Sequence, residues 1–338
     1  MKAIVRSTYG PPDVLELREV PMPVPGDGEV LVRVHAASVN RADIDYLTGR
    51  PLITRLATGF REPKHAGLGL DAAGVVEAVG PGVARFAPGD RVFSNLTEYG
   101  YGAFAEYACA PEKAWAPMPV GASFETAASL PESSCIAWQG LRKGRTIKAG
   151  DQVLINGASG NVGPFAVQLA KSFGAEVTGT CRTQKMDFVR SLGADHVIDY
   201  TTDDYTRQGG RYDFILDVWA RRSWLAPRRA LKPGGDYVMV GGSTAAIFEG
   251  LLLGPLLSAG RDRKLGLLLS WKPFDPPDVA TLSGLLETGV IRPTIDRRYP
   301  LAEVPEALRD LQSGRPRGKL IIEVVPPGTP PSGEALQA

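Results

Sequence analysis

The sequence predicts an α/β protein of two domains, in which an irregular β-rich domain precedes a parallel-sheet domain. The chain has 338 residues, which exceeds one ordinary compact core and suits two. Between Met1 and Pro119, Pro and Gly separate short β-branched runs such as EVLVRVHAAS and AAGVVEAVG. From Ala122 onward, helical stretches alternate with the strand-like runs VLIN, EVTGTC, HVID, FILDV and YVMVGG. That alternation indicates βαβ units and therefore a parallel sheet.

The chain after residue 265 predicts four further elements that could belong to either domain. They are a strand GLLLS, a helix from about Pro277 to Glu287, a second helix from about Glu303 to Gln312, and a strand KLIIEVV. The last thirteen residues, 326–338, are so rich in Pro and Gly that we expect a disordered tail.

The composition shows no charge excess that would attract nucleic acid or an anionic membrane. The formal net charge is +1, and the apolar fraction of 43% is near the globular average. Cys109, Cys135 and Cys181 are too far apart for a disulfide framework or a CxxC metal knuckle, which favours a reducing compartment. The N-terminal MKAIVRSTYG lacks a signal-peptide core. We expect a cytoplasmic protein with a small-molecule partner, without nucleic acid or membrane.

The most specific local pattern lies between Asp151 and Gly174, where the strand DQVLIN leads into GASGNVG and then into PFAVQLAKSFG. Strand, glycine turn and helix follow one another in the order that dinucleotide binding requires. We expect Gly157 to make the tight turn, Gly160 to admit the pyrophosphate, and Gly163 to let the helix pack on the sheet. The predicted cradle also includes Ala158, Ser159, Asn161 and Val162. The alternative interpretation is a βα turn that merely needs small residues.

The end of the next strand distinguishes the two nicotinamide dinucleotides. An NAD-binding fold usually places an acid about 20 residues after the glycines, whereas a 2′-phosphate needs cations and hydroxyls there. Residues 180–185, TCRTQK, contain no acid and two cations, Arg182 and Lys185. The pattern predicts NADPH as the cofactor, unless both cations are ordinary solvated charges at the start of a helix.

Eight segments spread over nearly the whole chain form a specific set of motifs. They are EVLVRVHAASVNRADIDYLTGR, GLDAAGVVEAVGPGVARFAPGDRV, GAFAEYA, LPESSCIAWQGL, LINGASGNVGPFAVQLAK, GADHVIDY, RPTIDRRYPL and RGKLIIEVV. Together they resemble the medium-chain dehydrogenase/reductase superfamily, in its zinc-independent branch of quinone oxidoreductases and enoyl reductases. The resemblance implies a GroES-like catalytic domain in residues 1–121, a Rossmann doubly wound cofactor domain in 122–264, and a segment 265–325 that completes the catalytic domain. It also implies an active site in the cleft between the domains.

The zinc ligands of related dehydrogenases have no counterparts here. Those relatives place a Cys near Asn40, a His near Leu70 and a further Cys near Glu132, and none of the three matches. The lobe that holds a four-cysteine structural zinc contains only Cys109. We therefore expect no metal, and we interpret Cys135 as a small buried hydrophobic residue.

Two residues are candidates for the catalytic machinery by resemblance. Asn40 takes the position from which zinc-free relatives present an amide to the substrate or nicotinamide, with a turn or cap role as the alternative. Tyr46 lies near a family tyrosine proposed to donate a proton or bind substrate, although Asp45 would align better, and packing is the alternative. We expect Asp43 to orient the local backbone. His35, His65 and His196 have no spacing that suggests a relay or a metal site.

Resemblance adds four residues to the cofactor site. Tyr200 matches a position beside the adenosine phosphate, although a tyrosine that ends a strand is commonplace. The loop near the nicotinamide is matched by Gly241, Gly242 and Ser243. The apolar stretch from Ile247 to Leu269 could be a pocket wall, a dimer contact or ordinary core. We expect a homodimer.

The missing zinc ligands point to conjugated electrophiles as substrates. A zinc alcohol dehydrogenase uses its metal as a Lewis acid, whereas hydride addition to an enone or quinone produces an enolate or hydroquinone that hydrogen-bond donors can stabilise. The leading hypothesis is an NADPH-dependent reductase of quinones or activated C=C bonds. The alternatives are a zinc-free carbonyl or alcohol dehydrogenase and a dinucleotide-binding protein without turnover.

Overall fold

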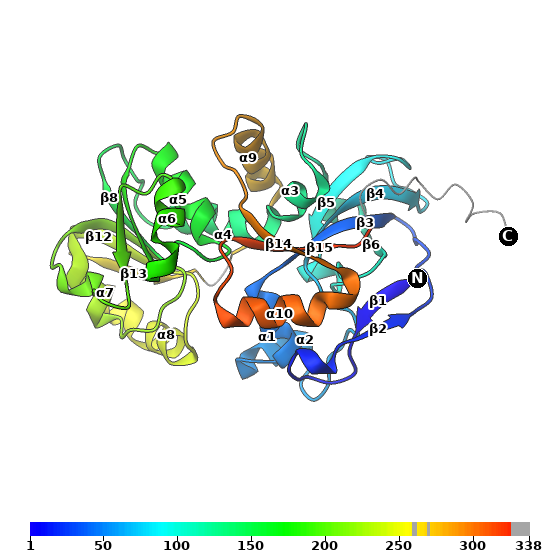
Figure 1. The fold of residues 1–338 in the computed structure, drawn as a ribbon, viewed down its shortest axis with the longest axis horizontal. Coiled ribbons are helices and arrows are strands. Elements are labelled where there is room, and N and C mark those ends of the chain that lie inside the picture. Colours follow the sequence, from blue (N-terminus) through cyan, green and yellow to red (C-terminus); the bar gives the residue numbers. More distant parts are fainter. Residues whose placement is uncertain (259–261, 269–270, 326–338) are drawn as a thin grey trace.

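The computed structural model describes residues 1–258, 262–268 and 271–325, and the predicted tail lies outside them. Two domains lie along the long axis of the molecule (Figure 1), one around a seven-stranded sheet and the other around a six-stranded sheet. The predicted α/β architecture with a β-rich first domain is therefore confirmed. Ten helices occur in the described residues: α1 (Arg41–Thr48), α2 (Arg55–Thr58), α3 (Phe124–Ala128), α4 (Pro131–Leu141), α5 (Gly163–Ser172), α6 (Met186–Ser191), α7 (Leu225–Ala230), α8 (Thr244–Ser258), α9 (Pro276–Glu287) and α10 (Val304–Ser313).

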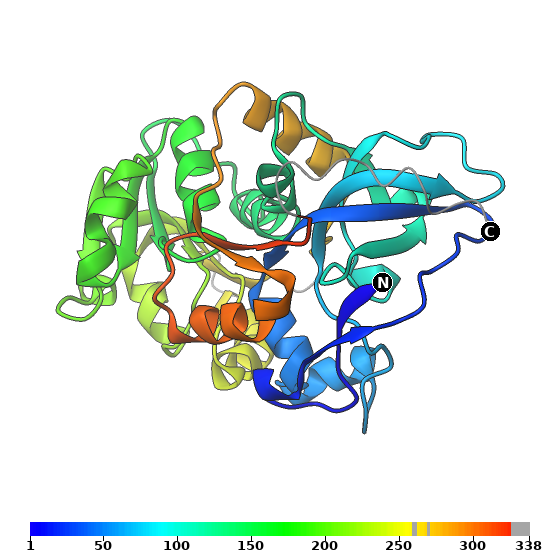
Figure 2. The same ribbon diagram turned by 45° about the vertical axis from the view of Figure 1, so that its right-hand side comes forward.

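The seven-stranded sheet combines the two ends of the chain. Its domain contains β1 (Lys2–Val5), β2 (Glu16–Glu19), β3 (Glu29–Val39), β4 (Asp71–Val79), β5 (Arg91–Asn95), β6 (Tyr107–Pro111), β7 (Trp115–Pro117), β14 (Ile295–Pro300) and β15 (Lys319–Glu323). The strand order is β14-β15-β3-β4-β5-β7, with β6 also paired to β3 and with β1 and β2 forming a separate pair. The C-terminal β15 lies antiparallel to β3, with Leu320 opposite Val39 (Figure 2). This register brings the C-terminal segment beside the end of β3.

The six-stranded sheet is parallel throughout, as the βαβ rhythm predicts. Its strands are β8 (Gln152–Asn156), β9 (Glu176–Cys181), β10 (His196–Asp199), β11 (Tyr212–Asp217), β12 (Leu231–Met239) and β13 (Lys264–Leu267), in the order β10-β9-β8-β11-β12-β13. The order reverses at β8, which is where doubly wound sheets open a crevice for a ligand. The boundary expected at residue 265 falls inside β13, and this strand begins two residues before the expected GLLLS run.

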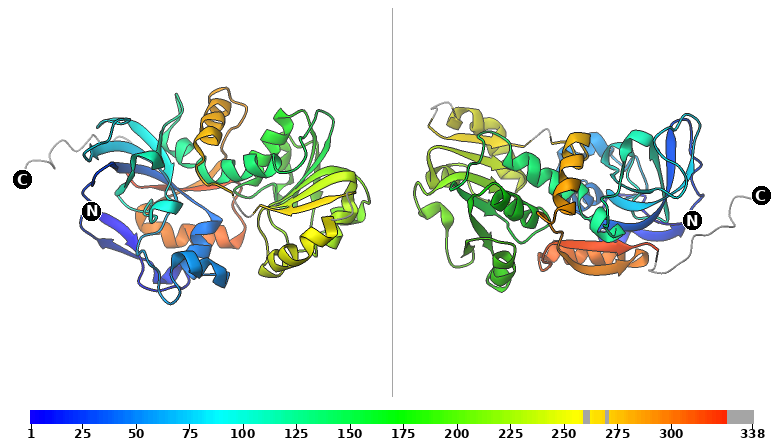
Figure 3. Two further views of the ribbon diagram at one scale, coloured as in Figure 1. Left: turned by 180° about the vertical axis from the view of Figure 1, so that it is seen from behind. Right: turned by 90° about the horizontal axis from the view of Figure 1, so that it is seen from above.

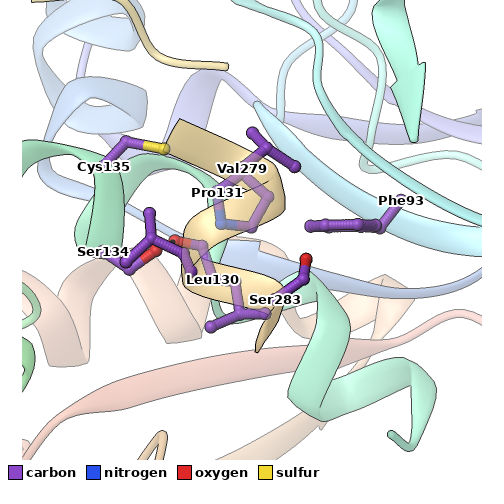
Figure 4. Close-up of a pocket in the computed structure, with 8 residues that line it drawn as sticks. Phe93, Leu130, Pro131, Ser134, Cys135, Val279 and Ser283 are labelled. Atoms are coloured by element: carbon purple, nitrogen blue, oxygen red, sulfur yellow. Dashed lines mark hydrogen bonds between the residues drawn. The ribbon is translucent and has the colours of Figure 1, made fainter. Parts of the chain in front are cut away.

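Helix α4 crosses between the two domains and packs on α5 and α9 (Figure 3). Pro131 begins this helix, where its missing N–H is harmless. A void of about 10 Å³ lies between α4 and α9, lined by Leu130, Cys135 and Val279 among others (Figure 4). Such a volume is the size of a single water, so it belongs to core packing. Cys135 has no exposed surface and lies within this core.

Among the described helices, none is both long and apolar enough to cross a membrane. The longest apolar one, α8, has fifteen residues. It carries the exposed side chains Phe248 and Leu252. Residues 259–261 and 269 of the apolar stretch discussed above lie outside the described residues.

Candidate active site

The glycine turn after β8 has the geometry that the sequence predicts for a phosphate cradle. Gly157 has a φ of +86°, which glycine adopts without strain. At Gly163 a Cβ would lie 2.3 Å from the carbonyl oxygen of Gly157, so only glycine allows α5 to start this close to the turn. At Gly160 the nearest atom to a Cβ would be 3.7 Å away, which leaves this part of the turn open. The turn can therefore admit a pyrophosphate against its backbone.

The rest of the turn joins the cofactor domain to the catalytic domain. Ala158 is buried, and its N–H donates to the carbonyl of Thr180 at 3.0 Å. Asn161 donates its side-chain amide to the carbonyl of Val39 at 2.8 Å, while its buried Oδ1 accepts no hydrogen bond. The N–H of Asn161 and that of Val162 find no acceptor within the parts of the chain that the structure describes. These N–H groups lie at the N-terminus of α5, where the helix dipole favours an anion.

The residues proposed to distinguish NADPH from NADH lie at the ends of β9 and β10. Arg182 is exposed and donates from Nε to the hydroxyl of Tyr200 at 2.8 Å, so these two predicted residues meet. The ammonium group of Lys185 points elsewhere and does not contact Arg182 or Tyr200. Lys185 is nine-tenths buried, and its Nζ donates to the carbonyls of Gly314 at 2.9 Å and Pro316 at 2.6 Å. Arg182 thus remains the better placed of the two cations.

The loop after β12 packs against the end of β11. Gly242 forms a bridge with Ala220, and a Cβ on this glycine would lie 2.3 Å from the Ala220 carbonyl oxygen. Ser243 donates its N–H to the same carbonyl at 2.8 Å, and Gly241 accepts from the N–H of Ala220 at 2.9 Å. The close approach explains the glycine at 242 and fixes the loop at the carboxyl edge of the sheet, where ligands bind in this architecture.

Asp217, at the end of β11, is a buried acid beside the glycine turn. It accepts from Asn156 Nδ2 at 2.7 Å, from the N–H of Trp219 at 3.1 Å and from the hydroxyl of Tyr237 at 3.0 Å. Burial nevertheless raises its pKa to about 6. The folded protein therefore holds a proton on this carboxyl at pH values where the unfolded chain has lost it.

This raised pKa predicts a pH-dependent loss of stability that Asp217→Asn removes. Protonated Asp217 contributes fully below pH 3.8, and the contribution is lost as the pH rises through about 6. Relative to the Asn variant, wild type should lose on the order of 2–3 kcal/mol across this interval. Urea unfolding from pH 4 to 7 measures the difference, with Asp27→Asn as an exposed control. Parallel pH profiles for wild type and Asp217→Asn would contradict it.

A buried polar network lies where β3 meets β15. Lys319 is fully buried, and its ammonium donates to Asn40 Oδ1 at 2.6 Å and to Ser133 Oγ at 3.2 Å. Asn40 is 1% exposed, and its amide nitrogen donates to Asp71 Oδ2 at 2.9 Å. The Lys319 ammonium lies 3.8 Å from the same carboxylate oxygen. Both ends of the Asn40 amide are therefore engaged inside the protein, where the residue bridges Lys319 to Asp71.

Asp71 is the carboxylate at the centre of this network, where burial raises its pKa and the Lys319 ammonium and the side-chain donors oppose that shift. Besides Asn40, it accepts hydrogen bonds from Ser38 at 3.0 Å and from Asn95 at 2.7 Å. Two neighbouring acids have fewer partners, because Asp43 Oδ1 and Glu132 Oε2 are buried and accept none. Burial raises the pKa of both of these carboxyls well above the usual range, with Asp71 adding to the shift. Asp43 Oδ2 accepts from the N–H of Asn40 at 2.7 Å, which supports the predicted role in orienting the backbone.

Tyr46 lies on α1, beyond the polar network. Its ring centroid is 5.1 Å from that of Tyr101, and no hydrogen bond to its hydroxyl occurs within the described residues. Burial, with smaller contributions from Tyr101 and Glu132, raises its pKa. The phenol therefore keeps its proton at neutral pH, as a hydrogen-bond donor must.

The positions of the zinc ligands do not fit a metal. Leu70 is fully buried and has no donor atom, while the oxygen of Asn40 already accepts from the Lys319 ammonium. Over the described ranges, no three His, Cys, Asp or Glu side chains cluster as a metal site. The buried cation in this part of the structure is an ammonium group.

A second cavity of about 320 Å³ adjoins the network through Asn95. Its other lining residues are Glu98, Tyr99, Lys113, Lys272, Pro273, Phe274, Asp275 and Pro276. The volume is within the range of small-molecule sites. The lining thus combines aromatic and charged side chains.

Sequence reasoning assigned no role to three residues that the structure places at the site, namely Asp71, Lys319 and Trp219. Asp71 and Lys319 lie within GLDAAGVV and RGKLIIEVV, and each is a charge at the start of a strand, directly before a run of apolar residues. That contrast was the available signal for a buried ion pair. Trp219 lies between two guanidinium groups, that of Arg41 at 5.4 Å and that of Arg221 at 4.8 Å from the ring centroid. This contact joins α1 to the cofactor domain, and no sequence spacing indicates it.

Known proteins resemble the chain along nearly its whole length. The model of the "Alcohol dehydrogenase GroES-like domain" matches residues 26–120, and that of the "Zinc-binding dehydrogenase" matches residues 192–322. NAD(P)H oxidoreductase RTN4IP1, mitochondrial, of Mus musculus is 32% identical, covering 96% of this chain and 89% of the relative. The quinone-oxidoreductase homolog, chloroplastic, of Spinacia oleracea is 33% identical, covering 96% and 98%. The structure of the quinone oxidoreductase from Coxiella burnetii superposes with a TM-score of 0.85 at 30% identity, covering 96% and 99%.

Proposed function

Because the chain belongs to the medium-chain dehydrogenase/reductase superfamily and is an NAD(P)H oxidoreductase like the quinone oxidoreductases, we propose that it reduces quinones or activated C=C bonds with NADPH and without zinc. The observation that carries the proposal is the network of Lys319, Asn40 and Asp71 next to the glycine turn. Asn161 connects the two through the carbonyl of Val39. This contact supports a proposed cofactor cradle that lies beside Asn40, the residue at a zinc-ligand position of the related dehydrogenases.

The side chains around Asn40 favour substrates whose reduction is assisted by hydrogen bonds and does not need a Lewis acid. Oxidation of a simple alcohol calls for strong stabilisation of an alkoxide, which zinc relatives obtain from three side-chain ligands. Here Leu70 provides no ligand atom, and Asn40 is occupied by Lys319. Hydride addition to an enone or quinone spreads the negative charge over a conjugated system, which hydroxyl and N–H donors can stabilise.

Each part of the chain has a defined task in this reaction. The dinucleotide, when bound, supplies the hydride. The turn at residues 157–163 holds the pyrophosphate through free N–H groups and the α5 dipole, and Arg182 holds the 2′-phosphate. Asn40 acts as a positioning residue that keeps Lys319 and Asp71 in place. Tyr46 provides a hydroxyl that keeps its proton, because burial raises its pKa.

The test is the oxidation of NADPH, followed by absorbance, with matched panels of quinones, enones, aldehydes and ketones. We expect turnover with quinones or enones, unchanged by a chelator, and less than one zinc per chain by elemental analysis. Ketone reduction without activity on the matching enone would favour a zinc-free carbonyl dehydrogenase. Tight NADPH binding without turnover of any acceptor would favour a non-catalytic dinucleotide-binding protein.

Asn40→Ala is expected to slow hydride transfer while leaving NADPH binding nearly unchanged. The substitution removes two hydrogen bonds to charged groups, so the rate should fall by roughly ten- to a hundredfold, or about 1.5–3 kcal/mol. The matched control is Asn161→Ala, which removes the contact between the turn and Val39 and should instead weaken NADPH binding. Single-turnover rates and dissociation constants separate the two effects. An unchanged rate in a folded Asn40→Ala protein would contradict the positioning role.

The oligomeric state and the compartment also belong to this proposal. A homodimer is supported by Phe248 and Leu252 of α8, which would be covered by a second copy, and sedimentation of the wild type and of Phe248→Ser/Leu252→Ser tests it. The cytoplasmic location rests on composition alone, whereas two relatives are named as mitochondrial and chloroplastic proteins. Cell fractionation decides between these compartments.

A further inference from the structure

One short segment of the catalytic domain exposes large apolar side chains to solvent. It comprises residues 50–64, which we call the basic apolar segment, and contains the 3₁₀ turn η2 (Leu52–Thr54) and helix α2. The exposed fractions are 71% for Leu52, 60% for Ile53, 72% for Leu56 and 76% for Phe60. Figure 1 shows α2 beside α1 at one edge of the molecule.

The polar side of this segment faces the protein. Thr58 is 1% exposed, and its hydroxyl lies 2.7 Å from that of Tyr9. The guanidinium of Arg55 lies 4.5 Å from the centroid of the Tyr9 ring, and its Nε donates to the carbonyl of Gly49 at 3.2 Å. A surface helix of a water-soluble protein normally has the opposite arrangement, with its apolar stripe facing the core. The outward-facing apolar side chains of this segment are therefore a candidate interaction surface.

The backbone around Gly59 forms a defined turn after α2. Gly59 has a φ of +117°, and a Cβ there would lie 2.1 Å from the carbonyl oxygen of Glu62. The N–H of Lys64 donates to the carbonyl of Thr58 at 2.8 Å, which closes the turn that carries Phe60.

Unpaired basic side chains surround the apolar ones. Residues 50–64 contain four basic residues and one acid, Glu62, so the local net charge is +3 against +1 for the whole chain. Arg50, Arg61 and Lys64 are exposed, and none of them has an ion-pair partner within the described ranges. Apolar residues flanked by Arg and Lys are typical of segments that lie in the interface of an anionic bilayer.

We propose that the basic apolar segment docks this protein on an anionic phospholipid surface. Leu52, Ile53, Leu56 and Phe60 enter the boundary between headgroups and acyl chains, while the basic side chains contact the lipid phosphates. The contact is peripheral, since α2 has only four residues. We expected no membrane partner because the net charge of the whole chain is only +1. That total does not show the local charge of +3 in residues 50–64.

The experiment is flotation of the full-length protein with vesicles of phosphatidylcholine containing 0, 20 or 40% phosphatidylglycerol. We expect the bound fraction to rise with the anionic lipid and to fall with salt. Leu56→Ser/Phe60→Ser and Arg50→Glu/Arg61→Glu should each weaken partitioning by at least about tenfold. The first variant removes apolar side chains that enter the bilayer interface, and the second reverses two charges that contact the lipid phosphates. All substituted side chains are exposed or unpaired, so thermal unfolding should stay unchanged.

Two matched controls separate this surface from general stickiness. Val24→Ser/Val120→Ser removes equally exposed apolar side chains elsewhere, and Lys148→Glu/Arg229→Glu makes the same charge change at other exposed positions. Both controls should float like the wild type. Absence of wild-type binding at every lipid composition would overturn the proposal. So would a dimer that only Leu56→Ser/Phe60→Ser dissociates without any vesicle binding, because the face would then be covered by a second copy.

Discussion

Lys319→Met is expected to destabilise the protein by about 3–5 kcal/mol, the usual cost of removing one partner from a buried ion pair. Lys319 and Asp71 are 1% and 0% exposed, and the substitution leaves Asp71 as a buried anion without its cation. It also removes the donor to Asn40 Oδ1. Denaturant unfolding monitored by fluorescence measures the loss, provided that the wild type unfolds in a single transition.

Two further variants show whether the unpaired charge causes this loss. Adding Asp71→Asn to Lys319→Met removes the stranded anion, so the double variant should recover part of the lost stability. Lys171→Met breaks the more exposed pair of Lys171 with Asp195, at 2.7 Å, and should cost less than about 1 kcal/mol. Equal losses in Lys319→Met and Lys171→Met, or no recovery in the double variant, would show that burial of this pair has no special effect.

Most of the fold could be predicted from local sequence patterns. The strands of the cofactor sheet are short β-branched runs separated by helical stretches, and a parallel arrangement follows from that rhythm. The glycine turn could also be predicted, because the backbone geometry itself requires glycine at positions 157 and 163. These features depend on residues that are close together in the sequence, and a single chain displays them directly.

The centre of the candidate site depends instead on contacts between distant segments. Lys319 reaches Asn40 only because β15 pairs with β3, and the two residues are 279 positions apart. Lys185 illustrates the same limit in the other direction. In the sequence it is a cation next to Arg182, but the chain returns at residues 314–316 and presents two carbonyls to its ammonium group. No spacing rule predicts which segment comes back to a given side chain.

Arg182→Ala is expected to weaken NADPH binding by roughly tenfold to a hundredfold while leaving NADH binding nearly unchanged. A charge-assisted hydrogen bond contributes about 1.5–3 kcal/mol, and each 1.4 kcal/mol changes affinity about tenfold. Arg182 is exposed at the end of β9. Apart from its Nε bond to Tyr200, its guanidinium has no partner among the residues that the structure describes, so the other N–H groups can bind a 2′-phosphate. Because the interaction is electrostatic and exposed, the preference for NADPH should also shrink as salt is added.

Lys185→Ala is the matched cation control for this prediction, because it removes the same charge three residues away. Its ammonium group binds the carbonyls of Gly314 and Pro316, so the substitution should lower stability and affect both cofactors alike. Tyr200→Phe should have a small, NADPH-specific effect, since it removes only the hydroxyl that orients Arg182. Titration calorimetry with both cofactors on wild type and the three variants decides the matter. Selective loss of NADPH binding in Lys185→Ala alone would assign the 2′-phosphate to Lys185, and a wild type that prefers NADH would refute the role of both cations.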